Sequence, residues 1–236
     1  MKRLLYSSLI IILLLLGAII WAIQKLGGFG YVWHRVQHRE WGVYYHRAQH
    51  FGKLPEEPGA IIFLGDSQIQ SAEWHEVFRV NKPVLNRGIS GDYTAGVLER
   101  LDEVLRHKPS KLFLLVGIND LFYGKEASEI ESDYRKIVQR TRSESSATEL
   151  FLLSVLPVNN KVRKLGIKNA EIQTLNNRIR QIARDFAVPY VDLSTPLTDA
   201  DGNLASKFTD DGLHINGLGY VVVKNSLGSF ISDNWQ

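Results

Sequence analysis

With 236 residues, 44% of them hydrophobic and 22% charged, the chain is long enough for one domain and an appendage and too apolar to be disordered. It has no cysteine, which excludes disulfide scaffolds, thiolate metal sites and a cysteine nucleophile, so any nucleophile is an oxygen. The net charge of +3 comes from residues 1–58, with seven Lys or Arg against three Glu, and the near-neutral remainder argues against nucleic-acid binding.

The first predicted element is a membrane-spanning helix over residues 4–23. This run contains no charge, and at about 1.5 Å per residue it would cross the roughly 30 Å hydrocarbon core of a bilayer. Lys2 and Arg3 precede it, and Trp21 lies where an interfacial aromatic residue would anchor it. A cleaved signal peptide would have a shorter apolar stretch and a small-x-small cleavage site. We therefore expect an uncleaved single-pass anchor at residues 1–24, with the amino terminus in the cytoplasm and the rest outside, in the periplasm or at the cell surface.

Residues 25–58 are predicted to form a juxtamembrane helical segment that ends in a linker. Two pairs, His34 with His38 and His46 with His50, have a four-residue spacing that would place both imidazoles on one helix face, where they could hold a metal ion. No carboxylate follows in the H-E-x-x-H manner, and the nearby Trp and Tyr residues favour a position at the membrane interface. We expect no metal here, and the role of the four histidines stays open.

Residues 59–236 alternate short apolar runs with longer amphipathic stretches. Near-continuous hydrophobicity is typical of strands that are covered on both faces. The predicted strands are residues 60–64, 84–85, 112–116, 150–155 and 188–191, and the predicted helices are 68–78, 94–107, 127–143, 169–186 and 217–231. Repeated strand-then-helix units predict a three-layer α/β/α domain with a five-stranded parallel sheet. Polar residues directly after the strands should gather at one edge of that sheet, where open α/β sheets bind ligands.

Ser67 follows the first predicted strand and begins a predicted helix. A hydroxyl at that position lies near the positive end of a helix dipole, and its own N–H has no helical partner. Both features would stabilise an oxyanion. A serine that only caps the helix fits the same pattern, and Ser67 alone does not separate the two interpretations.

His214 lies in a loop before the last predicted helix, three residues after Asp211. An imidazole can act as general base for a serine hydroxyl while a carboxylate fixes its tautomer. A tight turn is enough to bring Asp211 to the other ring nitrogen. The other two histidines of residues 59–236, His75 and His107, fall on predicted helices, where a solvent-exposed face is the default.

Two further residues are candidate donors to an oxyanion. Gly91 allows a close approach to its backbone N–H because it has no side chain, and Asn119 offers a side-chain amide. Taken singly, a glycine in a turn and an asparagine after a strand are also explained by local structure alone.

Four short blocks occur together in this order: Gly65-Asp66-Ser67, Gly91, Gly117-Ile-Asn119-Asp120, and Asp211-Gly-Leu-His214. With their approximate spacing, they resemble the four blocks of the SGNH hydrolases, also called the GDSL lipase/esterase family. The resemblance covers residues 59–232 and is strongest to the bacterial branch similar to platelet-activating-factor acetylhydrolase catalytic subunits and carbohydrate O-acetyl esterases. One departure is Gln68, where the family name has Leu, and we expect it to leave the mechanism untouched.

The resemblance implies a flavodoxin-like fold and a Ser-His-Asp hydrolase at residues 59–236 that needs no cofactor. It implies Ser67 as nucleophile, His214 as base and Asp211 as the residue that orients it. It also implies an oxyanion hole formed by the N–H groups of Ser67 and Gly91 and the amide of Asn119. An α/β-hydrolase is disfavoured because its G-x-S-x-G motif requires a second glycine where Ile69 stands.

The expected function is a membrane-anchored serine esterase that acts on O-acetyl groups of envelope carbohydrates. Alternatives are a lysophospholipase or lipase, an acyltransferase that uses the same acyl-enzyme, and a membrane-tethered binding protein without catalysis. The loop of residues 157–168 follows the fourth predicted strand and carries four Lys or Arg, which is compatible with an anionic or sugar-rich ligand and equally with a solvated loop.

Overall fold

The computed structural model describes residues 12, 15–22, 24 and 41–231. Backbone contacts divide the chain into two units, residues 1–45 and residues 46–236. The second unit contains every strand of the described residues. One helix, α3 (Trp41–Phe51), spans the boundary between the two units. The predicted domain limits at residues 24 and 58 stay predictions.

The central sheet has five parallel strands in the order β2-β1-β3-β4-β5. The strands are β1 (Ile61–Gly65), β2 (Val84–Gly88), β3 (Lys111–Leu115), β4 (Glu149–Leu153) and β5 (Tyr190–Val191). Because each neighbouring pair is parallel, all carboxyl ends lie at the same edge. This confirms the predicted five-stranded parallel sheet.

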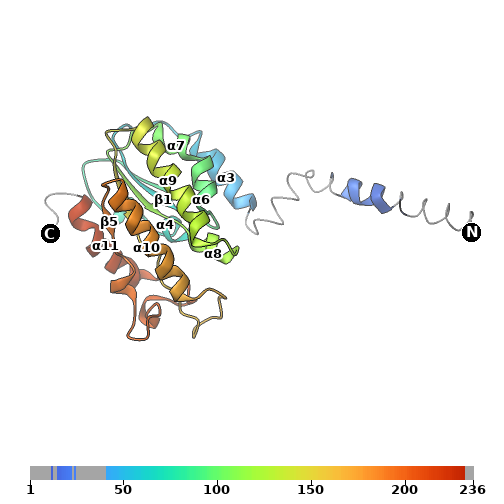
Figure 1. Cartoon of the computed structure of the whole chain (residues 1–236). Coiled ribbons are helices and arrows are strands. Elements are labelled where there is room, and N and C mark those ends of the chain that lie inside the picture. Colours follow the sequence, from blue (N-terminus) through green and yellow to red (C-terminus); the bar gives the residue numbers. More distant parts are fainter. Residues whose placement is uncertain (1–11, 13–14, 23, 25–40, 232–236) are drawn as a thin grey trace, which may run out of the picture. The chain divides into compact units, whose positions relative to one another are not determined.

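Two helical layers cover the sheet, because side chains alternate between its faces. On β1, Ile62 and Leu64 pack into one apolar layer, and Ile61 and Phe63 pack into the other. The first layer is formed by α6 (Thr94–Glu99), α7 (Leu101–Leu105), α9 (Ala127–Glu144) and α10 (Asn169–Asp185), with α9 and α10 in front of the strands in Figure 1. The second is formed by α4 (Ser67–Gln70), α5 (Trp74–Val77) and α11 (Gly217–Ile231). The predicted three-layer architecture is therefore confirmed.

Aromatic rings join α5 to the sheet in the second layer. The Phe63 ring stacks on Trp74 with centroids 4.0 Å apart, and on Phe113 with centroids 5.0 Å apart. The Trp74 indole N–H also donates to the carbonyl of Ile69 at the end of α4. Burying each of these rings stabilises the fold by about as much free energy as burying several methylene groups. The segment between β1 and β2 is therefore held firmly against the sheet.

Two predicted helices are each broken into two. Residues 68–78 form α4 and α5, and the carbonyls of residues 69, 70 and 72, at and beyond the end of α4, all accept from the Asn86 amide on β2. Residues 94–107 form α6 and α7, which meet at Arg100. The structure also has α8 (Ile118–Phe122), directly after β3, where no helix was predicted.

The prediction of a membrane-spanning helix over residues 4–23 is wrong. Within the described part of the chain, no helix has the length and apolar character needed to cross a bilayer. Residues 4–11, 13–14 and 23 lie outside the described residues. The predicted location outside the cytoplasm rested on this helix and stays a prediction.

Two of the four histidines of the juxtamembrane prediction lie within the described residues. His46 and His50 lie on α3 and are exposed, whereas His34 and His38 lie outside the described residues. Among the residues that the structure describes, no group of three or more His, Cys, Asp or Glu side chains is arranged to hold a metal ion.

Candidate active site

Three of the residues singled out from the sequence meet at the carboxyl edge of the sheet. Ser67 is the first residue of α4, two residues after the end of β1. His214 and Asp211 lie in the loop that precedes α11. The Ser67 hydroxyl is 3.0 Å from His214 Nε2, although 147 positions of sequence separate the two residues.

The hydrogen bonds fix how the imidazole is protonated. Nδ1 of His214 lies 2.8 Å from Oδ2 of Asp211, and because a carboxylate only accepts, Nδ1 carries the hydrogen. Nε2 then has a free lone pair that accepts from the Ser67 hydroxyl. This is the geometry that a serine nucleophile and a histidine base require.

Asp211 is held in its ionised form by the loop it belongs to. Partial burial raises its pKa, but hydrogen bonds from the His214 ring and from the backbone N–H groups of Leu213 and His214 outweigh burial and lower the pKa to about 2. Asp211 is therefore a carboxylate at neutral pH, and it aligns both the ring and the backbone of His214.

Gly91 and Asn119, the two candidate oxyanion donors, come together from separate loops. Gly91 has a φ of +78°, a conformation that favours glycine. Asn119, on α8, donates from Nδ2 to the carbonyl of Asp92, the residue that follows Gly91, at 2.8 Å. That bond places the Asn119 amide beside the Gly91 loop and uses only one of its two hydrogens.

Three carboxylates lie completely buried behind these residues: Asp66, Asp92 and Asp120. Burial, opposed by the Gln68 N–H and reinforced by the charges of Asp92 and Asp120, raises the pKa of Asp66 to about 7. Burial also raises the pKa of Asp92 to about 6, against the opposing effect of Arg100. Oδ2 of Asp66 has no hydrogen-bond partner. Burial therefore disfavours the ionised form of Asp66 and of Asp92.

Arg100 is a supporting residue that the sequence analysis missed. Its guanidinium forms an ion pair with Asp92 at 2.7 Å and donates to the carbonyls of Gly65 and Arg87, so it joins the ends of β1 and β2 to the Gly91 loop. The sequence did contain a signal. Arg100 follows Val97 by three positions and precedes Leu101 and Val104, so a charged residue falls on the apolar face of the helix.

Two loops that are bonded to each other border the Ser67 region: residues 157–168 and the loop that carries Asp211 and His214. In the loop of residues 157–168, Asn159 N–H donates to the carbonyl of Gly212 at 2.7 Å, and Arg163 lies 3.9 Å from Asp211. Lys161 in the same loop forms an ion pair with Asp201 instead. The four Lys and Arg side chains of this loop therefore do not form one cationic site.

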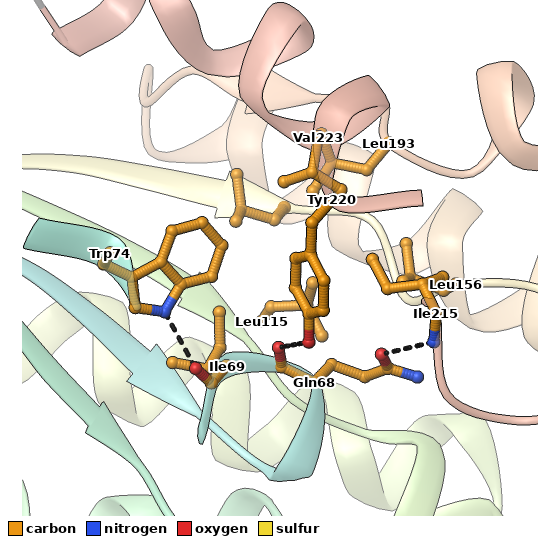
Figure 2. A pocket seen from close by; sticks show the side chains of 10 residues that line it. Gln68, Ile69, Trp74, Leu115, Leu156, Leu193, Ile215, Tyr220 and Val223 are labelled. Carbon is orange, nitrogen blue, oxygen red and sulfur yellow. Dashed lines mark hydrogen bonds between the residues drawn. The ribbon is translucent and has the colours of Figure 1, made fainter. Parts of the chain in front are cut away.

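An apolar hollow lies behind α4, between the sheet and α11 (Figure 2). Its lining includes Gln68, Ile69, Trp74, Leu115 and Tyr220. Its volume is about 10 Å³, room for a single water molecule.

Comparison with known proteins relates this site to ester-hydrolysing enzymes. The model of the GDSL-like Lipase/Acylhydrolase family matches residues 63–222. The chain is 30% identical over 177 residues to platelet-activating factor acetylhydrolase IB subunit alpha2 of Rattus norvegicus, covering 72% of this chain and 75% of that protein.

Solved structures share the fold. A Streptococcus pneumoniae protein described as a platelet activating factor superimposes with a TM-score of 0.74 at 29% identity, covering 90% of this chain and 99% of that one. An acetyl xylan esterase superimposes with a TM-score of 0.62 at 21% identity, covering 73% and 100%. At the lower identity the likeness concerns the fold alone.

Proposed function

Because the chain belongs to the GDSL-like lipase/acylhydrolase family and is a carboxylic ester hydrolase, we propose that it is a serine esterase that removes O-acetyl groups from carbohydrate. The observation that carries the proposal is the hydrogen-bonded series from Ser67 through His214 to Asp211, at 3.0 and 2.8 Å. Membership of an enzyme family also sets aside the alternative of a binding protein without catalysis.

In the proposed reaction, Nε2 of His214 takes the proton of the Ser67 hydroxyl as Oγ attacks the ester carbonyl carbon. The N–H groups of Ser67 and Gly91 and the free amide hydrogen of Asn119 stabilise the oxyanion. His214 then gives its proton to the departing alcohol oxygen, and the acyl group stays on Ser67. A water molecule, deprotonated by His214, attacks this acyl-enzyme. The bond between the acyl carbon and Ser67 Oγ then breaks, Oγ takes the proton from His214, and the acid is released. No metal or organic cofactor takes part.

A small acyl group and a sugar alcohol are supported by a structural neighbour that is named an acetyl xylan esterase. A second candidate is an acetylated lipid, which is favoured by the platelet-activating factor acetylhydrolase relatives at 30% identity.

The full chain should be tested by acetate release from acetylated xylooligosaccharides and from an acetylated phospholipid, and by fatty-acid release from a long-chain lysophospholipid. We expect release from the saccharide and loss of all activity in Ser67→Ala. A matched control is Ser143→Ala, because Ser143 is exposed at the end of α9. Preferential hydrolysis of either lipid would overturn the carbohydrate assignment, and acetyl transfer to an added sugar in place of acetate release would indicate a transferase. Full activity in Ser67→Ala would overturn the serine mechanism itself.

A further inference from the structure

The side chain of Gln68, the residue after the nucleophile, reaches across to the loop that carries His214. Its Nε2 donates to the carbonyl of Leu213 at 2.7 Å, and its Oε1 accepts from the N–H of Ile215 at 3.4 Å. Figure 2 shows the second of these bonds, with the amide extended toward Ile215. Gln68 therefore bonds to the residues on both sides of the proposed base.

The partners also determine which way the amide points. The Leu213 carbonyl can only accept and the Ile215 N–H can only donate, so nitrogen must face the first and oxygen the second. The side chain thus bonds the two neighbours of His214 in the way that a parallel strand bonds the neighbours of the residue opposite it. The loop gains a strand-like partner supplied by a side chain.

Gln68 is itself held rigidly. It is 4% exposed, its N–H donates to Oδ1 of Asp66 at 2.9 Å, and its carbonyl accepts from the Tyr220 hydroxyl at 2.7 Å (Figure 2). The backbone is fixed between β1 and α11, so the amide has a defined point from which to hold the loop.

The other hydrogen bonds of the His214 loop join it to itself or to segments other than α4. Asp211 bonds to Leu213 and His214 within the loop, and Asn159 bonds to Gly212 from a different loop. Within residues 41–231, the hydrogen bonds that join α4 to residues 209–216 come from Ser67 and Gln68. The Ser67 bond is the one that the reaction must break, which leaves Gln68 as the fixed link.

We propose that Gln68 is a positioning residue, which holds the His214 loop at reaction distance from Ser67 through its side-chain amide. The inference rests on the proposed roles of Ser67 and His214. It departs from the expectation that Gln68 leaves the mechanism untouched. Where the family name has Leu, this chain has a side chain that bonds to both neighbours of His214.

Gln68→Met tests the proposal because methionine keeps the length of the side chain and removes both hydrogen bonds. We expect kcat on a short-chain aryl acetate to fall about 10- to 100-fold with KM unchanged, since misplacing the base affects the transition state more than binding. Phosphonylation of Ser67 by a fluorophosphonate should slow by a similar factor, because it needs the same base. Gln68→Glu, which puts an oxygen against the Leu213 carbonyl, should also lose rate and decides the question if the Met variant does not fold.

Gln173→Met is the matched control, because it makes the same substitution at an exposed glutamine of α10. We expect it to retain nearly full kcat. A folded Gln68→Met protein with wild-type kcat and phosphonylation rate would overturn the proposal, as would equal losses in Gln68→Met and Gln173→Met, or a change confined to KM. Unchanged ester hydrolysis in Ser67→Ala is a different result, which would overturn the proposed function and with it the role given to Gln68.

Discussion

The Asn119 amide donates one hydrogen to the Asp92 carbonyl. In the proposed mechanism its second hydrogen is donated to the substrate oxyanion. Asn119→Ala should therefore lower kcat about 10²- to 10³-fold with little change in KM, since the donor acts on charge that develops in the transition state. Steady-state kinetics on an aryl acetate measure this, with the exposed Asn177→Ala on α10 as control. An Asn119→Ala enzyme whose loss lies entirely in KM would show that Asn119 binds substrate and does not stabilise the oxyanion.

The Asp66 carboxyl predicts a pH dependence of stability. Burial raises its pKa to about 7, whereas an unfolded aspartate titrates near about 3.9, so the folded protein binds the proton more tightly. The free energy of unfolding contributed by Asp66 is therefore highest below about pH 4 and falls as pH rises to about 7.

Asp66→Asn should remove this loss and still accept from the Gln68 N–H. We expect the variant to gain on the order of 2–4 kcal/mol over the wild type between about pH 4 and about pH 8. Urea unfolding across this range measures the difference. The exposed Asp201→Asn serves as control. A constant difference across the range would mean that Asp66 is ionised in the fold throughout.

At the scale of elements, Arg100 supports the loop that carries Gly91. It lies where α6 and α7 meet, and its guanidinium pairs with buried Asp92. Arg100→Met should lower the free energy of unfolding by about 3–5 kcal/mol, because it leaves a buried carboxylate unpaired. Chemical denaturation of the single variant and of the double variant with Asp92→Asn checks this. If the double variant is no more stable than Arg100→Met alone, the pair is not the source of the loss.

The broken helices also show where sequence periodicity fails. The apolar spacing of residues 94–107 continues past Arg100, so the sequence predicts one helix, but the guanidinium turns inward to carbonyls of other elements. Residues 68–78 do not form one helix because the Asn86 amide, from β2, donates to backbone carbonyls at and beyond the end of α4. Long-range hydrogen bonds of this kind leave no local pattern.

For the whole molecule, the alternation of apolar runs and amphipathic stretches was sufficient to predict the sheet and its two layers. It also predicted that polar residues after the strands and before the last helix would gather at one edge, and Ser67, after β1, meets His214, before α11, there. The run at residues 4–23 predicted a membrane-spanning helix from its apolar length, its flanking charges and Trp21, but no helix of the described residues could cross a bilayer. The hydrogen bonds from the Gln68 amide to Leu213 and Ile215 could not be predicted, since nothing near Gln68 in the sequence indicates that these two residues lie opposite it.

The central claim is that Ser67 is the nucleophile of an ester hydrolase, activated by His214. Mass spectrometry of the full chain after reaction with a fluorophosphonate tests it most directly. The account predicts one adduct, on the peptide that contains Ser67, with activity lost in proportion to labelling and labelling slowed in His214→Ala. An adduct on another residue, or an esterase that stays fully active with Ser67 modified, would contradict it.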